Sequence, residues 1–171
     1  MSKKKAGLLG LMIICLVVLD VALLTHRSPL SQKVLLQLEL EADQAQTVQV
    51  FYSETKAFGS GRCVEAALEK ADEKIELTFP IGMETEYLRL DLGNSPARWK
   101  IYGASLKYEE ETVALDLESS MEMGDAHQVG TIIQEDPALA VEGQGEDAYL
   151  VMSADLGAFR PQAEAQTRRA D

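Results

Sequence analysis

Most of the chain beyond residue 33 alternates between apolar and polar positions with a period of two. Within residues 34–41, three leucines fall on one face, and the polar residues between them fall on the other: Leu36, Leu38, Leu40, Gln37, Glu39 and Glu41. This alternation is typical of a β-strand with one buried face. The same pattern predicts strands over 47–53, 75–79, 87–92, 99–102, 105–109, 112–117, 130–133 and 148–153.

Turn-forming residues separate these segments and indicate the fold class. Pro80 should end the strand at 75–79, residues 93–96 read Gly-Asn-Ser-Pro, and Gly103 indicates a β-bulge. A helix is expected only at 65–72, which could equally form a strand and a turn. Strands spaced by about 8–12 residues favour an antiparallel, jelly-roll-like β-sandwich over residues 34–157. The strand order, jelly roll or immunoglobulin-like, stays open.

The N-terminus has a different composition from the rest of the chain. Residues 6–25 are apolar except for Asp20, and three lysines precede them. Twenty residues at about 1.5 Å each span the roughly 30 Å hydrocarbon core of a bilayer. A cleaved signal peptide would have a shorter apolar run and a better cleavage site, and Ile14 before Cys15 does not suit a lipoprotein signal. We expect a single transmembrane helix that includes Leu8, Leu11, Ile14, Leu16 and Asp20.

The lysines at positions 3–5 outweigh the charge that follows the apolar run, so the N-terminus should be cytoplasmic. This predicts a single-pass protein of the cell membrane. Residues 1–27 form the cytoplasmic stub and anchor, 28–33 a linker, and 34–157 an extracytoplasmic β-sandwich. Residues 158–171 lack an apolar pattern and are predicted to be a disordered tail.

The charge of the protein limits its partners. Sixteen Lys and Arg against 28 Asp and Glu give a net charge of −12. Nucleic acid is therefore excluded as a partner, because affinity for it comes from basic groups that neutralise phosphates. Between residues 34 and 160 there are 25 acidic and nine basic residues. An acidic external domain leaves neutral glycans, cations or basic protein surfaces as possible partners.

The sequence offers little for catalysis or metal binding. Of two histidines, only His127, in Asp125-Ala126-His127, has a neighbouring carboxylate in the external part, and a zinc site needs more ligands. No nucleophile elbow, P-loop or Rossmann glycine pattern is present. The protein is predicted not to be an enzyme and to need no cofactor. Structural calcium is the alternative, with the acidic residues of 109–111 and 145–147 as candidate ligands, although both segments lack the alternating Asp spacing of a dedicated calcium loop. Cys63 is expected to be a buried thiol.

Four residues form a candidate ligand-binding set: Trp99, Arg89, Asp91 and Tyr52. Sugars have apolar faces that stack on aromatic rings, and their hydroxyl groups pair with Arg and Asp side chains. Arg89 and Asp91 project to the face opposite the leucines of the strand at 87–92. The alternative is that Trp99 fills the core and that Arg89 and Asp91 form a cross-strand ion pair.

Several segments together carry a resemblance to a known family. They are residues 49–52 (Gln-Val-Phe-Tyr), 75–79 (Ile-Glu-Leu-Thr-Phe), 88–92 (Leu-Arg-Leu-Asp-Leu), the turn at 93–96, and 99–102 (Trp-Lys-Ile-Tyr). Over residues 34–108 the chain resembles the non-catalytic β-sandwich domains that accompany bacterial cell-surface polysaccharide glycosyltransferases. The resemblance implies a jelly-roll-like fold and an accessory role at the envelope, with the glycosyltransferase supplied by another chain.

These expectations together describe a membrane-anchored, non-catalytic accessory protein of the bacterial envelope. Residues 6–25 would lie in the lipid bilayer, and the β-sandwich would bind a polysaccharide-assembly enzyme or a cell-surface glycan. Gly7, Gly10 and Asp20 would allow the anchor to contact another helix. Two alternatives are a free-standing carbohydrate-binding or adhesin-like module and an unrecognised glycoside hydrolase.

Overall fold

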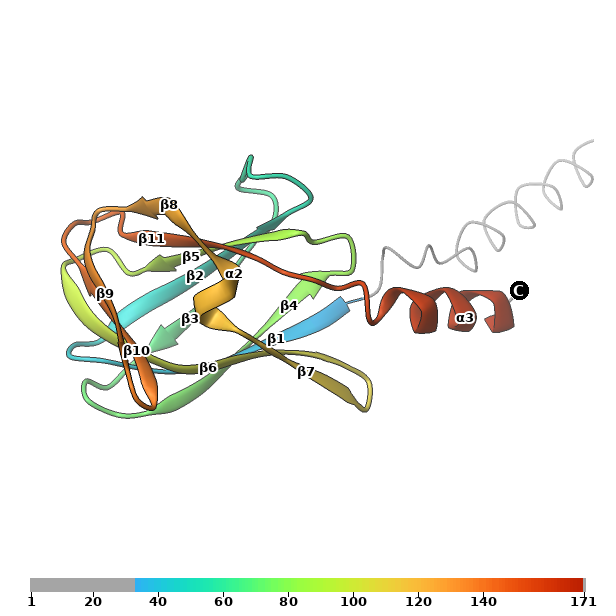
Figure 1. Ribbon diagram of the computed structural model, residues 1–171, viewed down its shortest axis with the longest axis horizontal. Helices are drawn as coiled ribbons and strands as arrows, with labels where there is room; N and C mark the ends of the chain where they lie inside the picture. The colour runs from blue at the N-terminus through green and yellow to red at the C-terminus, as the bar shows by residue number, and fades with distance from the viewer. Residues whose placement is uncertain (1–32, 171) are drawn as a thin grey trace, which may run out of the picture.

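The computed structural model describes residues 33–170, except for the side chains of 119–125, 166, 167, 169 and 170. Two antiparallel sheets pack face to face (Figure 1). The first sheet has the order β4 (Ile75–Gly82), β1 (Lys33–Ala42), β6 (Ala97–Tyr108), β10 (Ala138–Gly143) and β9 (Val129–Glu135). β7 (Glu111–Leu115) also pairs with β6. The second has the order β3 (Cys63–Leu68), β2 (Gln46–Ser53), β5 (Tyr87–Leu92), β11 (Tyr149–Ser153) and β8 (Met121–His127).

The predicted mainly β class and the β-sandwich are confirmed. The alternation places Leu36, Leu38 and Leu40 of β1 in the core, each at most 1% exposed, while the polar residues between them face outward. β2 and β5 contribute apolar side chains from the opposite sheet to the same core. Burying a leucine or valine side chain stabilises the fold by roughly 1.5–3 kcal/mol, so these alternating positions drive the packing of the two sheets.

The structure resolves one open prediction, corrects the end of one strand and confirms the expected bulge at Gly103. Residues 63–68 form the strand β3, which settles the ambiguity at 65–72 in favour of strand and turn. β4 does not end at Pro80 but continues to Gly82, which is possible because β4 is the edge strand of its sheet. The two strands predicted at 99–109 are one strand, β6, with a register shift: Glu39 pairs with Gly103 and Leu40 with Ile101. Tyr102 is thus the extra residue of a bulge beside Gly103.

Two strands were not predicted from the sequence. β8 has Gly124 and Ala126 among its seven residues, and β10 has Ala138 and Ala140 among its six. Small residues of low strand propensity weaken the alternation signal. β10 forms nonetheless because it lies between β6 and β9 and pairs with both.

The predicted tail at 158–171 is instead a helix up to Ala170, α3 (Arg160–Ala170). Phe159 and Ala163 are completely buried. The ring centroids of Phe159 and Tyr108 lie 6.0 Å apart. Gln162 also hydrogen-bonds to Glu111. Among the helix side chains that are described, Ala163 is the one buried, so no apolar period marks the helix in the sequence. A second, short helix, α2 (Leu117–Ser120), precedes β8.

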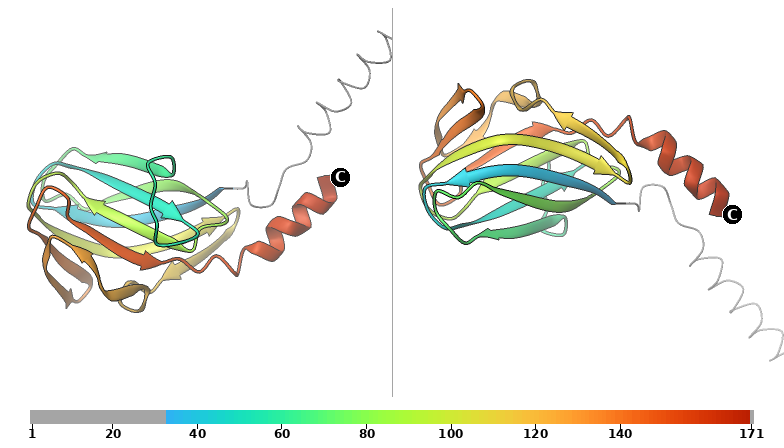
Figure 2. Two further views of the ribbon diagram at one scale, coloured as in Figure 1. Left: turned by 90° about the horizontal axis from the view of Figure 1, so that it is seen from above. Right: turned by 90° about the horizontal axis from the view of Figure 1, so that it is seen from below.

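β1 begins and α3 leaves the sandwich at the same end of the molecule (Figure 2). No helix within residues 33–170 has the length and apolar character needed to cross a membrane. The anchor predicted over 6–25, with Leu8, Leu11, Ile14, Leu16 and Asp20, lies outside the described residues.

Candidate functional site

The outer face of the second sheet, which points away from the core, brings together side chains from four strands. Phe51 on β2 pairs with Arg89 on β5, and Asp91 on β5 pairs with Tyr149 on β11. Tyr149 in turn pairs with His127, the last residue of β8. Directly paired residues share a face of the sheet and lie within contact distance. The strand register therefore gathers an arginine, a carboxylate and three rings on one surface.

Arg89 is the centre of this surface. Its guanidinium carbon lies 3.9 Å from the ring centroid of Tyr149 and 5.1 Å from that of Phe51. The imidazole of His127 stacks on Tyr149, with ring centroids 5.2 Å apart and planes inclined by 24°. Contacts of a cation with a ring face contribute about 0.5–2 kcal/mol each. The four side chains thus support one another in a fixed arrangement.

Two carboxylates hold the Arg89 guanidinium in place. Nε donates to Asp91 Oδ1 at 2.6 Å and Nη2 donates to Asp91 Oδ2 at 2.7 Å, so the pair is bidentate. Nη2 also donates to Asp147 Oδ1 at 2.8 Å. Burial is the largest single influence on the pKa of Arg89 and would lower it, but the hydrogen bonds to Asp91 and the charges of Asp91, Asp147 and Tyr149 together raise the pKa. Burial raises the pKa of Asp91, which is 8% exposed, and Arg89 offsets only part of that effect.

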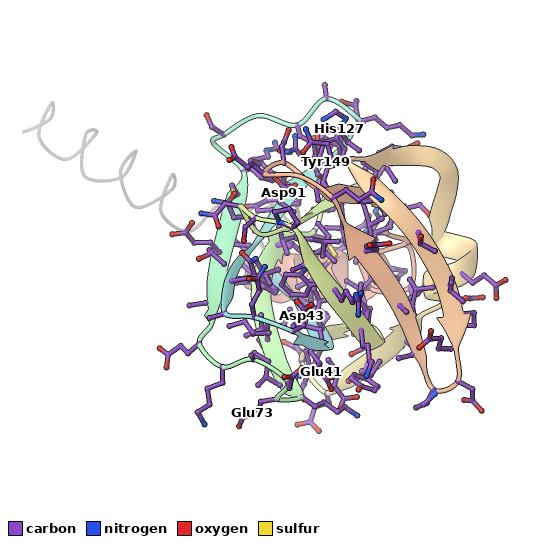
Figure 3. All side chains as sticks on the ribbon, turned by 90° about the vertical axis from the view of Figure 1, so that its left-hand side faces the viewer. Glu41, Asp43, Glu73, Asp91, His127 and Tyr149 are labelled. Atoms are coloured by element: carbon purple, nitrogen blue, oxygen red, sulfur yellow. The ribbon has the colours of Figure 1, made fainter. Side chains whose placement is uncertain are left out.

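A cavity of about 470 Å³ opens beside Arg89, and we call it the basic groove. This volume lies within the roughly 300–1,000 Å³ typical of small-molecule sites. Its lining comes from the second sheet and from the loop between β2 and β3: Lys56, Phe58, Arg89, Ala126, His127, Tyr149 and Val151. Figure 3 shows His127 and Tyr149 next to each other at one side of the sandwich, with Asp91 close by.

A second hollow, of about 310 Å³, is lined in part by Asp91, and we call it the acidic hollow. Its lining is Thr47, Gln49, Glu65, Asp91, Gly93, Asn94, Glu146 and Asp147. Two of these carboxylates, Glu146 and Asp147, belong to the candidate calcium segment 145–147. Among the side chains that the structure describes, no three of His, Cys, Asp or Glu are grouped so as to hold a metal ion.

The four candidate ligand-binding residues do not form a single site. Arg89 and Asp91 pair with each other along β5 rather than across strands, and they lie on the outer face. Trp99 is 1% exposed and belongs to the core, because the alternation of β6 turns it inward with Ala97 and Ile101. Tyr52 is likewise buried, and the Lys33 ammonium lies 5.6 Å from its ring centroid. The alternative reading of Trp99 as a core residue matches this placement.

Several residues of this surface were not predicted from the sequence. Phe51, Phe58 and Tyr149 were not predicted to belong to a site, and His127 lies at the end of the strand β8. The sequence does contain an indication of this surface. Phe51 and Tyr149 are aromatic residues at outward positions of predicted strands, where polar residues are expected. Cys63 is only partly buried and pairs with Phe51, and burial raises the pKa of its thiol.

Comparison of the chain with protein-family models, with curated proteins and with solved structures finds no match. The resemblance of residues 34–108 to glycosyltransferase-associated domains therefore stays a prediction.

Proposed function

We propose that this protein is a membrane-anchored, non-catalytic accessory protein of the bacterial envelope whose β-sandwich binds a cell-surface glycan in the basic groove. The proposal includes a jelly-roll-like course of the chain and one transmembrane helix over residues 6–25. The sandwich would lie outside the membrane, with the N-terminus in the cytoplasm.

One observation carries the proposal: a preformed groove in which aromatic rings and charged groups are held in a fixed geometry. Glycan sites need flat apolar surfaces for the faces of sugar rings and rigid polar groups for their hydroxyls. Phe58 and His127 supply rings at the groove, and Arg89 supplies a donor that Asp91 and Asp147 hold in place. Preorganisation of this kind lowers the entropy cost of binding.

The test is a glycan array of envelope polysaccharide fragments, probed with the full-length protein in a non-ionic detergent. We expect the protein to bind a defined subset of glycans and Phe58→Ala to lose that binding. Leu35→Ala is the matched control, because Leu35 is an apolar side chain, 37% exposed, on β1 of the other sheet. The proposal is wrong if no glycan binds, or if Phe58→Ala binds as well as the unaltered protein.

A second candidate function is recognition of a partner protein, such as a polysaccharide-assembly enzyme. Ile132 and Ile133 are 42% and 50% exposed on β9, the edge strand of the first sheet. An exposed edge strand offers unpaired backbone groups to a strand of another chain. In a pull-down from gently solubilised membranes, Ile133→Asp should release a partner that Leu35→Asp retains. Retention of the partner by both variants would contradict this candidate.

A further inference from the structure

We infer that the free edge of β9 pairs with the same strand of a second copy of this chain, antiparallel and centred on Ile133. The inference does not depend on glycan binding, because β9 belongs to the first sheet and the strands that line the basic groove belong to the second. It assigns the β9 edge to a second copy, in place of the other protein considered above for that edge.

The first observation is that β9 lacks the features that protect the other edge strands. The first sheet ends in β4 and β9, and the second in β3 and β8. β4 contains Pro80, and the three other edge strands each contain an acidic residue, Glu76 in β4, Glu65 in β3 and Glu122 in β8. Proline and charged residues keep an edge strand from pairing with another chain. β9 has no proline, and its one charged residue is Glu135, at its last position.

The second observation is the exposure of β9. Residues 130–135 are all exposed, and Ile132 and Ile133, at 42% and 50%, lie on opposite faces of the strand. Ile133 pairs with Ala140 of β10, which in turn pairs with Lys100 of β6. These three residues are among those that line a third hollow, of about 350 Å³. The small Ala140 therefore leaves Ile133 largely uncovered by its own sheet.

The register inside the sheet sets the centre of the pairing. β9 pairs with β10 without a break from Thr131 to Glu135, and Gly130 is the extra residue where the register shifts. A two-fold axis between two copies matches the strand with itself. Pairing that uses all of residues 131–135 is therefore centred on their midpoint, Ile133. It places Glu135 opposite Thr131 of the second copy, so the two Glu135 carboxylates do not face each other.

The charge of the chain explains why a second copy fits this edge. Two copies, each with a net charge of −12, repel each other where their acidic surfaces meet. Residues 128–134 carry no charge, so contact along β9 avoids that repulsion. A basic partner would instead be attracted to the acidic surfaces elsewhere. Stable complexes bury about 1,200–2,000 Å², and one pair of short strands buries less, so we expect a reversible dimer.

The experiment traps this dimer with a disulfide. In the full-length protein, in a non-ionic detergent, Cys15→Ser and Cys63→Ser remove both native thiols, and one new cysteine is added. Directly opposite residues of antiparallel strands have Cα atoms about 4.5–5.5 Å apart, a distance that a disulfide can bridge. Oxidation with copper phenanthroline should therefore link Ile133→Cys into dimers. We expect this to be at least about tenfold faster than the linking of Thr131→Cys.

Thr131→Cys tests the register, and a second variant tests random collision. In the proposed pairing, position 131 of one copy is displaced by four residues, about 14 Å along the strand, from position 131 of the other, which a disulfide cannot span. Leu35→Cys, at an apolar position of β1 that is 37% exposed, should be linked as slowly as Thr131→Cys. The thermal unfolding midpoints of all three variants are measured first, to confirm that each is folded.

Each other outcome would overturn the inference. Equal rates for the three variants would show random collision in place of pairing along β9. Faster linking of Thr131→Cys than of Ile133→Cys would show a pairing that is not centred on Ile133. Neither result bears on glycan binding, which the glycan array tests separately on the other sheet.

Discussion

Single side chains on β1 and β6 show how the outer surface of the sandwich is held together. Tyr102, the extra residue of the bulge in β6, donates its hydroxyl hydrogen to Glu41 Oε2 at 2.8 Å. The Nζ of Lys100 lies 3.4 Å from the other carboxylate oxygen, Glu41 Oε1. The hydrogen bond from Tyr102 is the main cause that lowers the pKa of Glu41 below its ordinary value of 4.5. The bulge thus has an electrostatic consequence for the neighbouring strand.

We predict that Tyr102→Phe raises the pKa of Glu41 back toward 4.5. Because the folded-state pKa of Glu41 lies below its unfolded value, its contribution to stability is present above about pH 4.5 and is lost as the pH falls through the folded value. A carboxyl-carbon NMR titration measures this directly. Tyr87→Phe removes a hydroxyl group on the other sheet and should leave the Glu41 titration unchanged. An unaltered Glu41 pKa in Tyr102→Phe would refute the assignment.

The turn at 93–96 is held by hydrogen bonds to Gln46, the first residue of β2. The buried Gln46 side chain donates to Ser95 Oγ at 2.7 Å and to the Ser95 carbonyl at 3.2 Å, and it accepts from the Asn94 N–H at 3.3 Å. Gly93 has a φ of +87°, which favours glycine. The predicted turn therefore depends on a side chain from the start of β2.

Gly93→Ala should lower the free energy of unfolding by about 1–3 kcal/mol, the cost of a strained backbone position. An added Cβ would also lie 2.3 Å from Gln46 Oε1 and would displace the Gln46 side chain. Gly59→Ala is the matched control, because no atom lies within 4 Å of its added Cβ. Urea unfolding of both variants provides the measurement. Equal stability of the two variants would show that the turn tolerates a side chain.

The helix α3 directly follows Phe159, which is completely buried. Phe159→Ala should lower the free energy of unfolding by about 3–5 kcal/mol, because it empties a completely buried site against Tyr108. It should also speed hydrogen exchange of the α3 amides. Glu164→Ala, at an exposed position of the same helix, should change stability by less than about 0.5 kcal/mol. If α3 exchanged at the same rate in Phe159→Ala, the helix would not depend on this contact.

In the described part of the chain, the residues of the hydrophobic core lie between Val34 and Ala163. We therefore predict that removal of residues 1–27 leaves the thermal unfolding midpoint of the sandwich unchanged. It should move the protein from the membrane fraction to the soluble fraction, because the apolar run at 6–25 is lost. Cell fractionation and calorimetry of both forms provide the measurements. A deleted form that stays in the membrane fraction would contradict the predicted anchor.

The alternation of apolar and polar residues was enough to predict which positions of β1, β2 and β5 face inward. Alternation with a period of two is a local property, and it requires only that one face of a strand be buried. The pattern therefore predicted the mainly β class, the β-sandwich and the turn at 93–96. It also allowed Arg89 and Asp91 to be placed together on an outward face.

Which strands are neighbours could not be predicted from the alternation and became known from the folded chain. Phe51, Arg89 and Tyr149 meet because β5 lies between β2 and β11 in a defined register. An alternating strand has the same pattern beside any partner, so pairing depends on how all the strands fill one core. The helix α3 likewise depends on tertiary packing, because the completely buried Phe159 precedes it. The groove exists because long-range pairing gathered residues that are far apart in the chain.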